Sequence, residues 1–175
     1  MSSEKITLQQ LESFLWETAE ILRGNMDASE YKDLMVGMIF LKSLSDSFEE
    51  EQEKVIKHYL SIGKTQQESK QLSSEVEEYT GKFFVPECAR WNQIKDLKHD
   101  IGLEINKATK KVEEYNPIVK GVFVSINFNF KNKLPEEKFQ DLISLFSRYR
   151  LRNNDFKDPD MMGSALEYLM KQLAD

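Results

Sequence analysis

The sequence contains few of the residues on which disulfides, metal sites and phosphate-binding loops depend. Its 175 residues include one cysteine, two histidines and seven glycines. Cys88 alone excludes an internal disulfide, which fits a reducing compartment, and no zinc-ligand spacing is present. The glycines stand singly, and neither a dinucleotide fingerprint, a P-loop nor a nucleophile elbow occurs. We therefore expect no metal site, no cofactor-binding residue and no catalytic residue in this chain.

Long apolar runs are also absent. The longest, with glycine included, covers residues 34–41, whereas a membrane-spanning helix needs about 20 apolar residues. The N-terminal sequence Met-Ser-Ser-Glu-Lys-Ile lacks the apolar core of a secretory signal. Hydrophobic residues make up 40% of the chain and charged residues 31%, which is typical of a soluble domain with its own core. We therefore expect a cytoplasmic, single-domain protein.

Charge is distributed unevenly along the chain. The net charge of −6 divides into −8 over residues 1–81, +5 over residues 82–157 and −3 over residues 158–175. An acidic protein with one basic segment can contact a polyanion through that segment. The alternative is that these lysines and arginines only solvate helices.

Hydrophobic periodicity predicts two helices in the first third of the chain. Thr7 is the expected N-cap of the first, which runs to Arg23 and stops at Gly24. Asp27 lies at capping-box spacing from a glutamate and opens the second, which extends toward residue 63. Periodicity alone leaves a buried strand open for residues 34–41. Gly37, inside this run, predicts the close approach of another backbone.

The remaining chain also has mostly helical patterns. Thr65 is expected to open a polar helix that runs through Glu78. Apolar residues between positions 94 and 112 trace one helical face, which Asn116 and its following proline end. The weak alternation near 119–130 predicts a small hairpin or an extended segment. Further helical starts are expected at prolines or aspartates, namely Pro86, Pro135 and Asp158 or Asp160.

The fold class that follows is mainly α, a bundle-like domain of several helices. We expect one domain over residues 1–175, with the first two helices in 7–63 and the remaining helical core in 82–157. Residues 64–81 have few apolar anchors and are predicted to form a polar, mobile excursion. A last helix is expected to start within 158–175.

One basic cluster suggests contact with nucleic acid. Three arginines lie within five residues around Tyr149, a composition suited to phosphate contact and stacking. The alternative is that they complement the dipole at a helix C-terminus. The candidate contacts with a DNA backbone are Arg148, Arg150, Arg152, Lys131 and Lys133.

Four short signatures occur in a characteristic order. They are Glu30-Tyr31-Lys32 with Phe40-Leu41-Lys42-Ser43-Leu44-Ser45-Asp46, then Val85-Pro86-Glu87 with Ala89-Arg90-Trp91, then Asn116-Pro117 with Lys120-Gly121-Val122-Phe123, and finally Met162-Gly163. In order and spacing they resemble the N-terminal helical domain of the modification (M) subunit of type I restriction-modification systems. The resemblance extends from about residue 8 to residue 173.

The resemblance implies a role inside a larger enzyme. In that family the domain precedes a Rossmann-like domain that methylates the N6 atom of adenine in double-stranded DNA with S-adenosylmethionine. A specificity subunit and, in the full complex, a restriction subunit are the implied partners. The family's cofactor loop (Phe-x-Gly-x-Gly) and its Asn-Pro-Pro-Tyr/Phe motif are absent here, so we expect no methylation by this chain alone. Residues 158–175 resemble the start of the linker helix to the catalytic domain.

Two functions are therefore in competition. The first is assembly and DNA clamping as the N-terminal module of such a methyltransferase subunit. The second is a stand-alone helical protein–protein interaction module from a split or truncated gene, which makes no DNA contact. The acidic first half favours the second function, and the basic segment favours the first.

Overall fold

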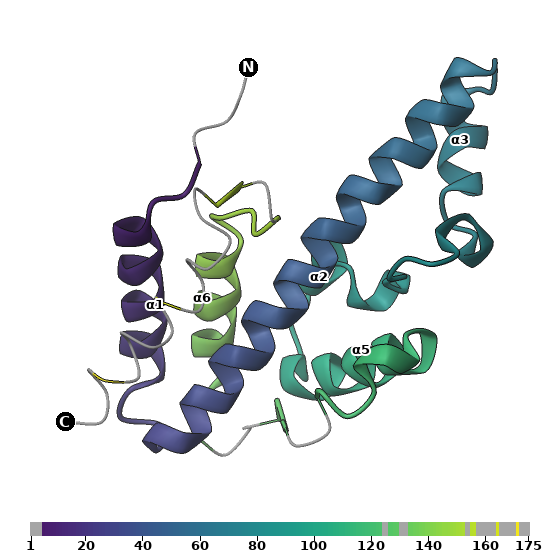
Figure 1. The fold of residues 1–175 in the computed structure, drawn as a ribbon. Helices are drawn as coiled ribbons and strands as arrows, with labels where there is room; N and C mark the ends of the chain where they lie inside the picture. Colours follow the sequence, from purple (N-terminus) through teal and green to yellow (C-terminus); the bar gives the residue numbers. More distant parts are fainter. Residues whose placement is uncertain are drawn as a thin grey trace.

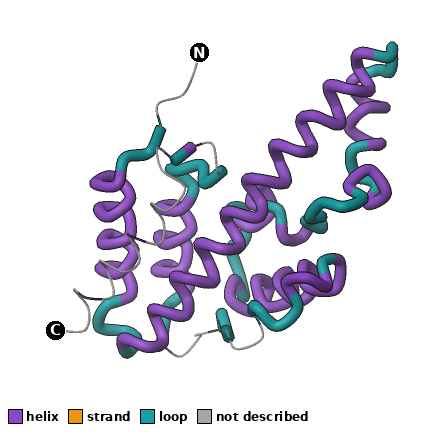
Figure 2. Tube along the Cα trace, viewed as in Figure 1, coloured by secondary structure: helices purple, strands orange, loops and turns teal. Residues whose placement is uncertain are grey.

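The computed structural model describes residues 5–123, 126–129, 133–152 and 155–156, together with Ser164 and Lys171. Within these ranges the chain is helical, and its only β-type pairings are two isolated bridges. The expected mainly α fold is therefore confirmed (Figures 1 and 2). No helix among the described residues combines the length and the apolar character needed to cross a bilayer.

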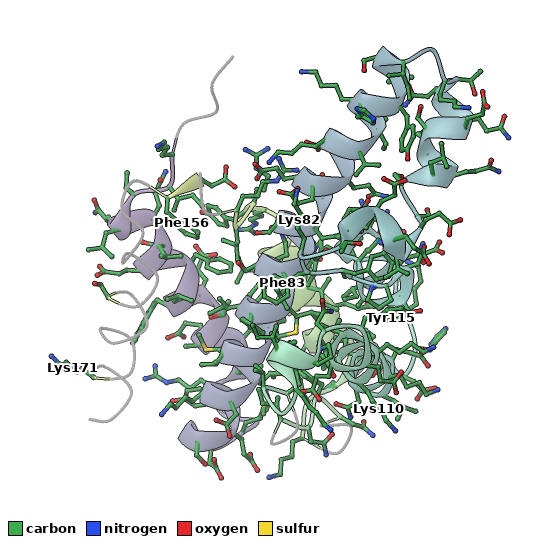
Figure 3. All side chains as sticks on the ribbon, turned by 45° about the vertical axis from the view of Figure 1, so that its right-hand side comes forward. Lys82, Phe83, Lys110, Tyr115, Phe156 and Lys171 are labelled. Atoms are coloured by element: carbon green, nitrogen blue, oxygen red, sulfur yellow. The ribbon has the colours of Figure 1, made fainter. Side chains whose placement is uncertain are left out.

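One long helix organises the molecule. Helix α2 (Ala28–Ser61) runs diagonally between the pair α1 (Leu8–Leu22) and α6 (Glu136–Phe146) on one side and α5 (Ile101–Tyr115) on the other (Figure 1). Helix α3 (Gln66–Leu72) folds back along the outer end of α2. Side chains fill the space between these helices (Figure 3).

Local capping fixes where the first two helices begin. Thr7 and Gln10 exchange side-chain and backbone hydrogen bonds of 3.1 and 2.9 Å, and Asp27 and Glu30 do the same at 3.0 and 3.2 Å. Both predicted N-caps are confirmed, and Gly24 follows α1 with a φ of +89°. Helix α2 is unbroken over 34 residues, about 51 Å at 1.5 Å per residue, which excludes a strand over residues 34–41.

The group that packs against Gly37 is not the backbone that the sequence predicted. A Cβ at Gly37 would lie 2.7 Å from the ring of Phe128, so a side chain approaches it and not a backbone. The close backbone contact lies at Gly102 of α5, where a Cβ would stand 2.1 Å from the Phe128 carbonyl oxygen. The segment 126–129 therefore packs between α2 and α5 by using two glycines. It forms no strand in its described residues.

Residues 64–81, which we call the outer arm, contain two short helices where one was predicted. Helix α3 begins at its Thr65 cap as expected, but it ends at Leu72 and is followed by the 3-10 helix η1 (Val76–Tyr79), so the prediction of one helix through Glu78 is wrong. Tyr79 is buried against Phe48 of α2, with ring centroids 4.8 Å apart. The arm therefore has an aromatic anchor at its base, and its mobility stays a prediction.

The middle of the chain contains two short helices in place of one. Pro86 caps the 3-10 helix η2 (Glu87–Ala89), and α4 (Trp91–Ile94) follows. The apolar positions from 94 to 112 do not form one helix, because α5 starts only after Asp100, whose φ of +50° is left-handed. A left-handed residue interrupts the α-helical path, so α4 and α5 are separate.

The end of α5 and the whole of α6 follow the sequence patterns. Asn116 stops α5, and Pro117 opens the 3-10 helix η3 (Pro117–Val119). Pro135 caps α6 as expected, and the buried residues of this helix are Phe139, Leu142, Ile143, Leu145 and Phe146. The helix expected within 158–175 lies outside the described residues, apart from Ser164 and Lys171.

Candidate assembly and nucleic-acid interface

The arginine cluster lies on a non-helical segment that is bound to α2. Helix α6 ends at Phe146, so the following backbone groups need partners outside the helix. Lys42 Nζ donates to the Tyr149 carbonyl at 2.8 Å, and Ser43 Oγ donates to the Leu151 carbonyl at 3.1 Å. The Leu151 N–H donates to Asp46 Oδ2 at 2.8 Å. One turn of α2 therefore holds the backbone of residues 149–151.

We call Lys42, Ser43 and Asp46 the α2 clamp. Lys42 and Asp46 form a buried ion pair one helical turn apart, with side chains 4% and 5% exposed. Burial lowers the pKa of the Lys42 ammonium, and the adjacent Asp46 carboxylate opposes that shift. Since one Asp46 oxygen accepts from both Lys42 and Leu151, its carboxylate joins the ion pair to the segment.

Arg152 points inward. Its side chain is 8% exposed, and Nε donates to the Asp46 carbonyl at 3.0 Å. Its Nη2 lies 3.1 Å from Glu53 and 3.5 Å from Glu49, both on α2. This guanidinium therefore binds the segment to α2, a role that the sequence pattern did not indicate.

Arg150 and Arg148 are more accessible. Arg150 is 48% exposed and binds Asp155 through Nε and Nη2, the latter at 2.7 Å. Burial would raise the pKa of the Asp155 carboxyl, but hydrogen bonds from Arg150 and from the Arg152 backbone lower it overall. Arg148 is 65% exposed and lies 3.3 Å from Glu17 of α1.

Lys133, one of the two candidate lysines, does not join the arginines. Lys133 pairs with Glu30 in the first turn of α2. Glu30 precedes Asp46 by 16 residues, which corresponds to roughly 24 Å along the helix. Lys131 lies outside the described residues. The structure thus places the three arginines on one segment and Lys133 near the opposite end of the α2 core.

The clamp turn also fixes the Ala89-Arg90-Trp91 signature. Ser45 accepts from the Trp91 backbone N–H at 2.7 Å, and Trp91 Nε1 donates to Ser147 Oγ at 2.9 Å. Trp91 is buried and packs against Phe146 of α6. Ser45 forms none of the hydrogen bonds that hold residues 149–151. It binds Trp91 on the core-facing side of the same helical turn.

A second group of buried hydrogen bonds lies at the Asn116-Pro117 signature. Asn116 Oδ1 accepts from the Phe84 N–H at 2.9 Å, and its Nδ2 donates to the carbonyls of Phe84 and Val112 at 2.7 Å each. The Val85-Pro86 signature therefore begins where Asn116 holds the chain. Signatures far apart in sequence meet at these hydrogen bonds.

The sequence did contain a signal for the clamp. Lys42 and Asp46 are charged residues at i, i+4 spacing beside an apolar run, and such a pair is buried only when other groups satisfy it. The spacing alone does not say which segment binds there. For that reason the clamp was not among the predicted site residues.

The surface around the segment is open and of mixed charge. A depression of about 320 Å³ lies beside it, lined by Glu50, Glu53, Lys54, Lys57, Arg150 and Arg152. Among the described residues, no three histidine, cysteine, aspartate or glutamate side chains group as metal ligands. The depression therefore brings acidic and basic side chains together on an open surface.

Comparison with known proteins gives a family context. The family model described as "HsdM N-terminal domain" matches residues 11–146. The chain is 27% identical over 172 residues to the "Type I restriction enzyme MjaIX methylase subunit" of Methanocaldococcus jannaschii. That match covers 92% of this chain and 30% of the relative, so the chain spans less than a third of the relative's length.

Proposed function

Since this chain belongs to the HsdM N-terminal domain family, we propose that it serves assembly and DNA clamping as the N-terminal module of a type I restriction-modification methylase subunit. The observation that carries the proposal is the family match over residues 11–146. The similarity to an archaeal methylase subunit supports it. Catalysis belongs, in this proposal, to the part of the subunit that the chain does not include.

The proposed division of labour follows from the missing motifs. The remaining part of the subunit would transfer a methyl group from S-adenosylmethionine to the N6 atom of adenine. Flipping of the target base out of the duplex would occur there as well. This chain would hold that part against double-stranded DNA, together with a specificity subunit and, in the full complex, a restriction subunit.

The DNA contact is proposed for the accessible part of the arginine segment. Arg148 and Glu17 are 65% and 54% exposed, and an exposed ion pair of this kind contributes only about 0–1 kcal/mol, so a phosphate can compete for the arginine. Arg150 presents a half-exposed guanidinium on the same segment. Arg152 contributes indirectly by holding the segment. Lys133 offers a separate contact beside the start of α2.

A specific observation supports the second candidate function. Arg148, Arg150, Arg152 and Lys133 each have an acidic partner within the chain. If those pairs persist in the assembly, the surface is suited to protein contact without DNA. The stand-alone interaction module therefore remains the alternative proposal.

Complementation distinguishes these functions. The chain is mixed with a separately produced C-terminal methyltransferase part and a specificity subunit, and S-adenosylmethionine-dependent adenine methylation of DNA is measured. We expect activity only when all components are present. The same mixture without this chain is the control. If a folded chain restores no activity, the interaction module becomes the better interpretation.

A further inference from the structure

We propose that Lys42, Ser43 and Asp46 are positioning residues for the DNA contact, because they fix the backbone of residues 149–151, from which Arg150 projects and which directly follows Arg148. This inference rests on the proposed DNA clamping by those arginines. It assigns a role to the Phe40–Asp46 signature, namely that one turn of a helix sets the place of a basic segment about 100 residues later. The clamp residues themselves would not touch DNA.

The first argument is the burial pattern within the segment. Leu151 is fully buried, and both its N–H and its carbonyl bind the clamp. Its neighbour Arg150 is half exposed. Since the backbone is held on both sides of the Leu151 Cα, the position from which the Arg150 side chain leaves the surface is also fixed.

The second argument is the central place of the Asp46 carboxylate. It receives the Lys42 ammonium and the Leu151 N–H, while Lys42 also donates to the Tyr149 carbonyl. A neutral group at position 46 would weaken its bond to Lys42 and remove the carboxylate that is paired directly with that buried ammonium. The loss of one charge would therefore loosen contacts at two residues of the segment.

The third argument is that the segment is also anchored from its far side. Asp155 accepts from the Arg152 N–H at 2.9 Å and binds Arg150. The Asp155 carbonyl in turn accepts from the Ile6 N–H at 2.6 Å. An isolated parallel bridge pairs Ile6 with the next residue, Phe156, whose position is labelled in Figure 3. With the segment held on both sides, a change in the clamp would alter the arginine positions without detaching the segment.

The position of the segment matters because α2 carries further cations beside it. Lys54 and Lys57 line the same open depression as Arg150, alongside Glu50 and Glu53. The two lysines lie three residues apart and hence on the same side of the helix. A phosphate backbone that spans the depression would meet groups from α2 and from the segment together. The clamp therefore holds Arg150 at a fixed position relative to Lys54 and Lys57 of α2.

The test is a mutant cycle in the assembled enzyme, formed from this chain, the C-terminal methyltransferase part and the specificity subunit. DNA binding is measured by fluorescence anisotropy across a salt series. Asp46→Asn keeps the shape of the side chain and removes its charge. It is made alone and in an Arg148→Ala, Arg150→Ala background. Ser45→Ala is the matched control, because it removes one buried hydrogen bond from the same turn on the Trp91 side.

We expect Asp46→Asn to weaken binding about 3- to 10-fold and to reduce the slope of log affinity against log salt by about 1–2, as the loss of one or two phosphate contacts would. In the double-arginine background the same substitution should have less than about a 2-fold effect, since its targets are already gone. Ser45→Ala should leave the salt slope unchanged. This non-additivity is not expected of a residue that only stabilises the fold.

Two different failures can be told apart. If the double-arginine variant itself leaves affinity and salt slope unchanged, the proposed DNA contact fails. If the arginines matter but Asp46→Asn acts equally in both backgrounds, or Ser45→Ala changes the slope equally, the positioning role is overturned. Should Asp46→Asn not fold, Ser43→Ala takes its place in the cycle, because it removes only the single bond to the Leu151 carbonyl.

Discussion

At the scale of single residues, buried polar side chains of this protein hydrogen-bond the backbone of other segments. Asp46 binds Leu151, Asn116 binds Phe84, and the Tyr79 hydroxyl donates to the Ser73 carbonyl at 2.6 Å. Each bond satisfies a backbone group that lies outside regular secondary structure. Such groups are costly when they are buried and unpaired. These residues therefore determine where loops dock onto helices.

Tyr79 provides a residue-scale prediction. Burial raises the pKa of the Tyr79 hydroxyl to about 12 from its ordinary value of 10.0, although the Arg90 guanidinium opposes the shift. A raised folded-state pKa means that the contribution to stability is complete below pH 10 and is lost as the pH rises toward 12. At pH 11 the wild-type protein should therefore have lost about 1.4 kcal/mol relative to Tyr79→Phe, compared with their difference at pH 8.

Urea denaturation of the wild-type protein and of Tyr79→Phe between pH 8 and pH 11 measures how the difference in their free energies of unfolding changes with pH. The lost hydrogen bond to Ser73 shifts the Tyr79→Phe curve by a constant amount, so the comparison uses the change in the difference. Parallel curves over the whole range would contradict the prediction.

At the scale of elements, the segment 126–129 packs against both α2 and α5. Phe128 is fully buried, and its N–H donates to Asn106 Oδ1 of α5 at 2.8 Å. Its ring packs over Gly37 of α2, and its carbonyl packs on Gly102 of α5. The two glycines allow an approach that any side chain would obstruct.

Gly102 gives the element-scale prediction. In an open helix, Gly→Ala would stabilise by about 1 kcal/mol through propensity. Here the added Cβ would meet backbone atoms at 2.1 and 2.8 Å, so we expect Gly102→Ala to lower the free energy of unfolding by about 1–3 kcal/mol. Urea denaturation measures it, with Lys107→Ala on the exposed face of α5 as the control. A stabilised Gly102→Ala variant would show that segment 126–129 is not packed there.

At the scale of the whole molecule, α2 belongs to two different environments. Its inner half contains fully buried side chains such as Leu34, Met38 and Leu41. Beyond Phe48 none of its residues is buried. The helices α3 and η1 lie along this outer part (Figure 1), and Arg152 contacts it at Glu49 and Glu53. The arm is attached at its base by the Phe48–Tyr79 contact and by the ion pair of Lys82 with Glu51 at 2.7 Å.

This asymmetry predicts uneven local stability along one helix. Few buried apolar contacts favour local opening, so amides of residues 52–61 should exchange with opening free energies about 2 kcal/mol or more below those of residues 34–48. Native-state hydrogen exchange with peptide-level mass spectrometry measures both halves in one sample. Equal protection along α2 would contradict this prediction. The mobility predicted for residues 64–81 is tested separately, by the exchange of their own peptides in the same sample.

Local chemistry in the sequence determined much of the fold. The caps at Thr7, Asp27 and Thr65 and the stops at Gly24 and Asn116 were predictable, because each depends on groups within a few residues. The start of α6 after Pro135 was predictable in the same way. The gap between α4 and α5 was not, since a left-handed Asp100 leaves no mark in an apolar pattern.

Only the tertiary structure decided the arrangement of the candidate site. The sequence showed three neighbouring arginines, but it could not separate the buried Arg152 from the exposed Arg148. The acidic partners of Arg148 and Arg152 lie 99 to 131 residues away along the chain. The clamp that holds the backbone of residues 149–151 is equally distant. Spacing reports contacts within an element, whereas the direction of a charged side chain depends on what the fold brings next to it.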